Sequence, residues 1–141
     1  MENRGNAFVK IGICDDVPIL RDVIESYIRA YEKQKGLSFQ IDKFSSGEEL
    51  IKEFEKGGSY DLLFLDQKMK ILTGLETAQQ IRKFNSPASC RIVFVTSTDN
   101  HYQFRSVQPL MVIAKPVSME MISEVLNMAT KQVIAAINAQ M

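Results

Sequence analysis

Five short apolar segments alternate along the chain with longer segments in which apolar residues recur every three or four positions. The apolar segments are FVKIGIC (8–14), LSFQIDKF (37–44), DLLFL (61–65), RIVFV (91–95) and LMVIA (110–114). Their length and their β-branched residues predict strands. LSFQIDKF alternates apolar and polar residues, as a half-exposed edge strand does, whereas DLLFL runs apolar up to Asp66 and predicts a central strand.

Helices are predicted between and after these strands, over residues 17–34, 46–56, 74–84, 99–106 and 118–138, the fourth being the weakest. Two of them carry an apolar stripe that should face the sheet. The stripe of the first helix comprises Ile19, Val23, Ile24, Tyr27, Ile28 and Tyr31, and that of the last comprises Met121, Val125, Met128, Val133 and Ile137. Ser46, with Glu49 three residues later, matches a capping box. The repeated strand–helix order predicts a parallel sheet with right-handed crossovers and helices on both faces.

Polar residues close four of the five predicted strands. They are Asp15 and Asp16 after the first strand, Asp66 after the third, Thr96 after the fourth and Lys115 after the fifth. In a parallel sheet the carboxyl ends of all strands lie at one edge, and ligands bind in the crevice beyond them. Three carboxylates, one hydroxyl and one ammonium are therefore expected in one small pocket.

This set of groups suits a divalent cation and a phosphoryl group. Carboxylate oxygens are ligands for a hard cation such as Mg²⁺, which neutralises their mutual repulsion. An aspartate can also act as a nucleophile and form an aspartyl-phosphate. Asp66 is the predicted nucleophile because its strand is the most apolar. Lys115 would supply positive charge and Thr96 a hydroxyl to the phosphoryl oxygens.

Each of these residues also has a simpler interpretation when it is taken alone. Asp15 or Asp16 would cap the helix that begins near Pro18. Asp66 would be one of the aspartates that commonly follow strands, Thr96 would cap a loop, and Lys115 with Pro116 would form a solvated turn. The functional interpretation rests on their joint placement at one edge of the sheet, which capping does not require.

The composition of the chain indicates which classes of protein it can belong to. The 141 residues suit one domain, and 45% hydrophobic content is enough for a full core. The 17 basic and 17 acidic residues cancel, so no long-range field favours nucleic acid or an anionic membrane. The chain has no signal-peptide pattern and no apolar run near the ~20 residues of a membrane span, so we expect a soluble protein of the cytoplasm. Cys14 and Cys90 are not expected to form a disulfide.

The motifs IGICDD, LFLDQKM with Gly74 eight residues beyond Asp66, VFVTS and AKPV together resemble the receiver domain of two-component response regulators. The resemblance covers about residues 8–136. It implies an α/β, flavodoxin-like, doubly wound five-stranded parallel sheet of order 2-1-3-4-5 with five helices. It also implies that Asp66 accepts a phosphoryl group from a sensor histidine kinase. Mg²⁺ would be held by Asp15, Asp16, Asp66 and the backbone carbonyl of Lys68, while Thr96 and Lys115 would read the phosphorylated state.

The segments SSGEEL and VQPLMVIAKPV look most like LytTR-type (LytR/AgrA) regulators, in which a DNA-binding domain normally follows the receiver. Residues 1–141 are expected to be a single receiver domain with no effector domain. We expect that this domain is not an enzyme and that it does not bind nucleic acid or a membrane directly. The free domain would sample inactive and active conformations, and phosphorylation would favour the active one. The face formed by helix 4, strand 5 and helix 5 would change as a result, and this face is a candidate homodimer contact.

Three residues depart from the usual pattern of this family. Lys70 stands where proline is common in the loop after the phosphorylation site. Gln67 follows the acceptor where an apolar or acidic residue is frequent, and such a residue affects how fast the phosphoryl group is lost. Val112 stands where an aromatic switch residue is common, so coupling would run through the loop and helix after Thr96.

Three other interpretations were weighed. A phosphatase of the haloacid dehalogenase type needs a second aspartate two residues after the nucleophile, where this chain has Lys68. A nucleotide or flavin binder would need a glycine- or hydroxyl-rich loop after the first strand, where CDDVP offers repulsion. The main alternative is a degenerate receiver that binds partners without phosphorylation, which Lys70 and Val112 keep open.

Overall fold

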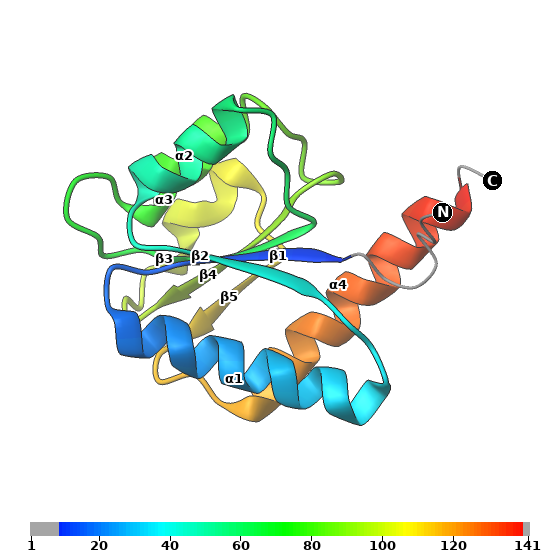
Figure 1. Cartoon of the computed structure of the whole chain (residues 1–141). Helices are drawn as coiled ribbons and strands as arrows, with labels where there is room; N and C mark the ends of the chain where they lie inside the picture. Colours follow the sequence, from blue (N-terminus) through cyan, green and yellow to red (C-terminus); the bar gives the residue numbers. More distant parts are fainter. Residues whose placement is uncertain (1–8, 140–141) are drawn as a thin grey trace.

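Five parallel strands form one sheet in the order β2-β1-β3-β4-β5 (Figure 1). The structure is a computed structural model that describes residues 9–139. The strands are β1 (Lys10–Cys14), β2 (Gln40–Phe44), β3 (Leu62–Asp66), β4 (Arg91–Thr96) and β5 (Met111–Ala114). The predicted strand order and the predicted edge position of the second strand are thus confirmed. Phe8, where the first strand was predicted to begin, lies outside the described residues.

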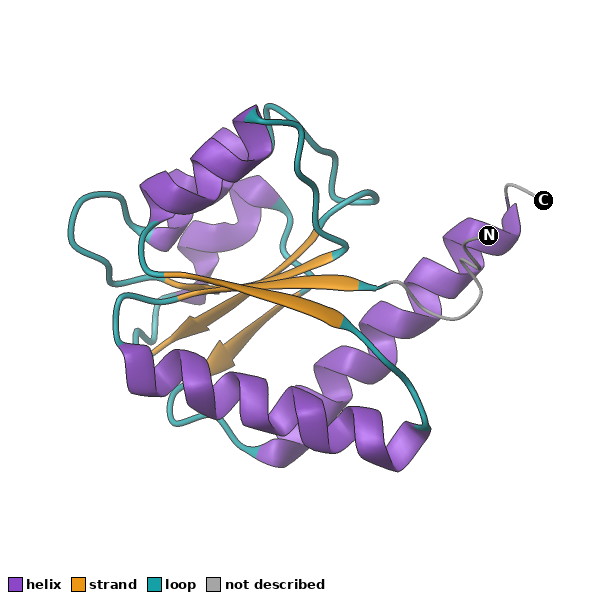
Figure 2. Ribbon diagram, in the orientation of Figure 1, coloured by secondary structure: helices purple, strands orange, loops and turns teal. Residues whose placement is uncertain are grey.

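Helices cover both faces of the sheet (Figure 2). They are α1 (Pro18–Lys35), α2 (Gly47–Glu55), α3 (Gly74–Ile81), the 3₁₀ helix η2 (His101–Val107) and α4 (Met119–Ala139). Helices α1 and α4 pack on one face, and α2, α3 and η2 pack on the other. The weak fourth helix of the prediction is therefore a short 3₁₀ helix, and the flavodoxin-like fold is confirmed.

The central strands are buried on both faces, as the apolar run in β3 predicted. All five residues of β3 and all six of β4 are buried. Leu62 and Phe64 join the core under α1 and α4, whereas Leu63 and Leu65 join the core under α2 and α3. Alternate side chains of a strand point to opposite faces, so one strand serves both cores. Each such side chain contributes about 2 kcal/mol relative to an exposed one.

The predicted apolar stripes of α1 and α4 each include one residue that is exposed in the structure. Ile19 is 66% exposed, whereas Leu20, four residues before the buried Ile24, is half-buried and lies on the side of the stripe. Met128 is likewise 38% exposed, whereas its neighbour Ala129 is buried. Successive residues lie about 100° apart on a helix, so a shift of one position turns a side chain out of the core. The Ile137 side chain lies outside the described part of the chain.

Helix starts differ from the prediction in their capping. Ser46 Oγ accepts a hydrogen bond from the Glu49 N–H at 3.1 Å, as predicted. The Glu49 carboxylate, however, accepts from the Ser45 N–H at 2.8 Å, so the expected capping box with Ser46 is wrong. A complete capping box instead starts α3, where the Thr73 and Glu76 side chains each accept the other's backbone N–H.

Helix α3 ends at Ile81, three residues before the predicted end, and residues 82–84 continue as turns. Cys14 and Cys90 are both buried and are not joined by a disulfide in this structure. Among the described residues, no helix combines the length and apolar character needed to cross a membrane.

Candidate functional site

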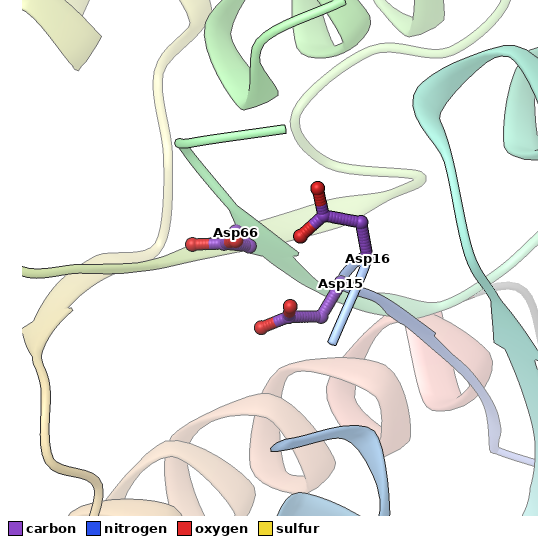
Figure 3. Close-up of side chains that lie close together, drawn as sticks. All are labelled: Asp15, Asp16 and Asp66. Atoms are coloured by element: carbon purple, nitrogen blue, oxygen red, sulfur yellow. The ribbon is translucent and has the colours of Figure 1, made fainter. Parts of the chain in front are cut away.

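Three aspartates gather at the carboxyl ends of β1 and β3 (Figure 3). Strands β1 and β3 are neighbours in the sheet, with Cys14 paired to Leu65, so the residues that follow them emerge side by side. Asp15, Asp16 and Asp66 each offer a carboxylate oxygen, and these oxygens lie within 4.8 Å of one another. Asp15 and Asp66 are buried and Asp16 is half-buried. The predicted convergence of these carboxylates is thus observed.

Asp15 divides its two carboxylate oxygens between two roles. Its Oδ1 accepts a hydrogen bond from the Val17 N–H at 2.9 Å, which supports the turn that leads into α1. Its Oδ2 is buried and has no hydrogen-bond partner among the described residues. The capping interpretation of Asp15 therefore accounts for one oxygen only. The other oxygen has the Lys115 ammonium 3.7 Å away but no hydrogen bond, and a bound ion or water would complete its surroundings.

Lys115 follows β5 and reaches across the neighbouring strand to the carboxylates. Its Nζ lies 2.9 Å from Asp66 Oδ1 and 3.7 Å from Asp15 Oδ2. Its backbone N–H donates to the Thr96 carbonyl at 3.0 Å, which fixes the starting point of the side chain. Within residues 9–139, Lys115 is the only basic residue that forms an ion pair with any of the three aspartates. One ammonium thus lies between two of the three carboxylates.

Thr96 is the last residue of β4 and lies at the same edge of the sheet. It is buried, and its Oγ1 accepts a hydrogen bond from the Thr98 N–H at 3.1 Å. The hydroxyl donates no hydrogen bond to any of the described residues. Its proton is therefore available to an acceptor bound at the edge of the sheet.

Burial raises the pKa of the Asp66 carboxyl above its ordinary value. The hydrogen bond from Lys115 opposes this increase, and the charges of Asp15 and Asp16 add to it. Crowded, partly desolvated carboxylates are stabilised by a proton or by a cation. The three aspartates, with the unsatisfied Oδ2 of Asp15, fit a hard divalent cation with oxygen ligands.

The loop from residue 67 to residue 73 connects Asp66 to α3. The Lys68 and Lys70 side chains are exposed, while Gln67 is half-buried. Gly74 begins α3 so close to the strand that a Cβ there would lie 2.3 Å from the Asp66 carbonyl oxygen. Only glycine therefore allows α3 to start against Asp66, which gives a physical reason for the spacing between Asp66 and Gly74.

Cys14 lies beside the acidic cluster and is unsuited to act as a nucleophile. Burial and the charges of Asp15 and Asp66 raise the pKa of its thiol far above its ordinary value. Its Sγ donates to the Ser46 carbonyl at 3.3 Å. Because thiolate is the reactive form, Cys14 is a structural residue of the core.

The sequence model described as the response regulator receiver domain matches residues 11–127. Among curated proteins, no sequence match to the chain was found.

Several solved structures share the fold. The response regulator protein TrrA from Thermotoga maritima, in complex with Mg(2+)-BeF, is 26% identical, with 85% of this chain and 97% of that chain covered and a TM-score of 0.69. The response regulatory domain of mrkE from Klebsiella pneumoniae is 23% identical, with 89% and 98% covered and a TM-score of 0.77. The REC domain of AraT from Geobacillus stearothermophilus is 21% identical, with 96% and 100% covered and a TM-score of 0.72.

Proposed function

Because the chain belongs to the response regulator receiver domain family, we propose that Asp66 accepts a phosphoryl group from a sensor histidine kinase in the presence of Mg²⁺. The family acts in two-component signalling, as a signalling module rather than as an enzyme. The observation that carries the proposal is the buried carboxylate of Asp66, grouped with Asp15 and Asp16 and contacted by Lys115 at 2.9 Å. A degenerate receiver would have no need for this arrangement of charges.

In the proposed transfer, a carboxylate oxygen of Asp66 attacks the phosphorus atom. The new P–O bond forms as the bond between phosphorus and the kinase histidine nitrogen breaks, and that electron pair leaves with the imidazole. The reaction requires Asp66 in its ionised form, and Lys115 favours that form. Lys115 would then bind a phosphoryl oxygen, and Thr96 would donate its free hydroxyl proton to another.

Asp15, Asp16, Asp66 and the backbone carbonyl of Lys68 would hold the Mg²⁺ ion. When bound, Mg²⁺ supplies positive charge that offsets the negative charge of the phosphoryl oxygens. The unsatisfied Oδ2 of the buried Asp15 supports this assignment. The complex of the Thermotoga maritima protein TrrA with Mg(2+)-BeF is a related observation in a similar protein.

The proposed output runs from Thr96 to η2. Phe94 lies two residues before Thr96 on β4, so both side chains point to the face that η2 covers. Phe104 of η2 is buried and stacks on Phe94 with 4.2 Å between ring centroids. Val112 of β5 pairs with Phe94 and packs in the same cluster. Because position 112 holds valine in place of the common aromatic residue, we propose that Phe104 is the aromatic residue that couples Thr96 to the surface.

Arg82 anchors the other end of η2. Its guanidinium donates to the Val107 carbonyl at 2.8 Å, to the Gln108 carbonyl at 3.3 Å and to the Cys90 carbonyl at 2.7 Å. We propose that η2, β5 and α4 form the output face and a homodimer contact. Movement of Thr96 would be passed to Thr98, in the loop between β4 and η2, and from there to the output face. Arg82 would meanwhile hold the C-terminal end of η2 in place.

We further propose that the output is regulation of transcription. The SSGEEL and VQPLMVIAKPV segments favour a LytTR-type regulator that acts through a separate DNA-binding domain. The receiver itself, which we take to be a single domain acting in the cytoplasm, would not bind DNA, because its formal net charge is zero.

Beryllofluoride, a stable mimic of the phosphoryl group, tests the proposal. Hydrogen exchange is measured with Mg²⁺ alone and with Mg²⁺ plus beryllofluoride, for the wild type and for Asp66→Asn. We expect beryllofluoride to change exchange in residues 96–110 of the wild type only. Binding without any change in this segment would contradict the output mechanism. Absence of binding would favour a degenerate receiver that acts without phosphorylation.

A further inference from the structure

Gln67 holds the start of α3 with both its backbone and its side chain. Its carbonyl oxygen accepts the Gly74 N–H at 2.9 Å, and its side-chain Oε1 accepts the Leu75 N–H at 2.8 Å. The next donor, the Glu76 N–H, is taken by Thr73 Oγ1 at 3.1 Å. The first four N–H groups of a helix, counted from its N-cap residue, have no partner within the helix, and Gln67 satisfies two of these four in α3.

These hydrogen bonds close the loop that follows Asp66. Gln67 is the first residue of the loop, and Gly74 comes directly after its last residue, Thr73. Because a Cβ at Gly74 would lie 2.3 Å from the Asp66 carbonyl oxygen, the two ends of the loop are in direct contact. Gln67 thus joins the end of β3 to the start of α3 at the acidic cluster.

The middle of the loop has few other anchors. Among the described residues, no backbone N–H of residues 68–72 donates a hydrogen bond. Met69 turns inward, with its Sδ 3.7 Å from Cys14 Sγ, while Lys70 and Ile71 are exposed. The path of the main chain at Lys68 therefore depends on the polar contacts of its neighbour Gln67.

We propose that Gln67 is a positioning residue for the cation, a role that rests on the proposed function. By closing the loop, Gln67 fixes the main chain at Lys68, whose carbonyl is the proposed fourth oxygen ligand. Groups that orient metal ligands influence metal affinity without touching the metal. Gln67 would set the Mg²⁺ affinity of the receiver, and through it the Mg²⁺ concentration needed for phosphoryl transfer.

The test compares Gln67→Met with Thr73→Ala. Gln67→Met keeps the length of the side chain and removes the acceptor of the Leu75 N–H, whereas Thr73→Ala removes the acceptor of the Glu76 N–H in the same helical turn. Both variants should destabilise the start of α3 to a similar degree, which urea unfolding in chelator measures. Direct Mg²⁺ binding to the metal-free proteins is then measured by titration calorimetry.

We expect Gln67→Met to bind Mg²⁺ about tenfold more weakly than the wild type, and Thr73→Ala to bind it with unchanged affinity. With acetyl phosphate, Gln67→Met should need about tenfold more Mg²⁺ than the wild type to reach half of its own maximal rate. Equal Mg²⁺ affinity in Gln67→Met and the wild type would overturn the inference. Equal weakening in both variants would also overturn it, since any loss of helix capping would then suffice. A wild type that binds no Mg²⁺ would instead remove the proposed function itself.

Discussion

Lys115 Nζ lies 2.9 Å from Asp66 Oδ1, although Lys115 follows β5 and Asp66 ends β3, strands that β4 separates. The same ammonium lies 3.7 Å from Asp15 Oδ2. Among residues 9–139, no other basic side chain forms an ion pair with these two carboxylates, while the Arg21 guanidinium donates to the Asp15 backbone carbonyl at 2.7 Å. The charge of Asp15 and Asp66 is therefore balanced mainly by Lys115 and by any cation that binds beside it.

Replacing Lys115 by methionine should lower the stability of the metal-free protein. The change leaves Asp15 and Asp66 without their ion-pair partner and removes a hydrogen bond between charged groups, which costs about 2 kcal/mol. Urea unfolding in chelator measures the loss, and Mg²⁺ should restore part of it. Lys131→Met, at an exposed site on α4, is the control and should change stability by less than about 0.5 kcal/mol. Equal stabilities for the two variants would contradict this account.

The pH dependence of metal-free stability should report the environment of Asp66. Burial raises the folded-state pKa of Asp66 above its unfolded value of about 4. Between these two pKa values the folded state holds the proton more tightly, so the contribution of Asp66 to stability falls as pH rises. Below both values the contribution does not change with pH. In chelator, the stability of the wild type relative to Asp66→Asn should therefore fall from about pH 4 upward. A relative stability that rises with pH over this range would contradict the raised pKa.

Mg²⁺ should stabilise the folded protein through the acidic cluster. A cation that binds only the folded state adds about 2.7 kcal/mol at one hundred times its dissociation constant. Asp16→Asn should abolish most of this gain, and because Asp16 is only half-buried the variant should fold normally without Mg²⁺. Thermal unfolding with and without Mg²⁺ measures the effect. Retention of the full gain in Asp16→Asn would exclude Asp16 from the proposed ligand set.

Gly74→Ala should destabilise the protein by about 3 kcal/mol, because its Cβ would press on the Asp66 carbonyl oxygen at 2.3 Å. Gly57→Ala is a matched control in open space, where only the φ of 93° opposes a side chain and the cost is about 1 kcal/mol. The Mg²⁺ affinity should fall in the first variant alone. Unfolding and Mg²⁺ titration of both variants check this, and similar costs at the two sites would contradict the close approach of α3 to Asp66.

Much of the fold and of the acidic cluster could be predicted because the signals are local. The apolar run before Asp66 predicts a central strand, and parallel topology brings the residues after β1, β3, β4 and β5 to one edge. The convergence of Asp15, Asp16, Asp66 and Lys115 follows from these two facts alone. The functional roles of these residues, and of Thr96 and the Lys68 carbonyl, remain predictions.

Other features depend on geometry that a linear pattern does not contain. Ile19 and Met128 are apolar yet lie one helical step outside the buried stripes. The sequence places Gln67 beside Asp66, but its hydrogen bond to the Leu75 N–H depends on where α3 begins in space. Arg82 binds the backbone carbonyls of Cys90 and Val107. Every residue has such a carbonyl, so the sequence does not reveal which ones Arg82 binds. The Thr73–Glu76 capping box, by contrast, matches a sequence pattern that predicts it.

The most direct test of the central claim is the intact mass of the protein after incubation with acetyl phosphate and Mg²⁺, beside Asp66→Asn and a sample in chelator. The account predicts one phosphoryl adduct on the wild type, and none on Asp66→Asn or without the cation. The same adduct on Asp66→Asn, or no adduct on the wild type with any phosphoryl donor, would contradict the assignment of Asp66 as the phosphoryl acceptor.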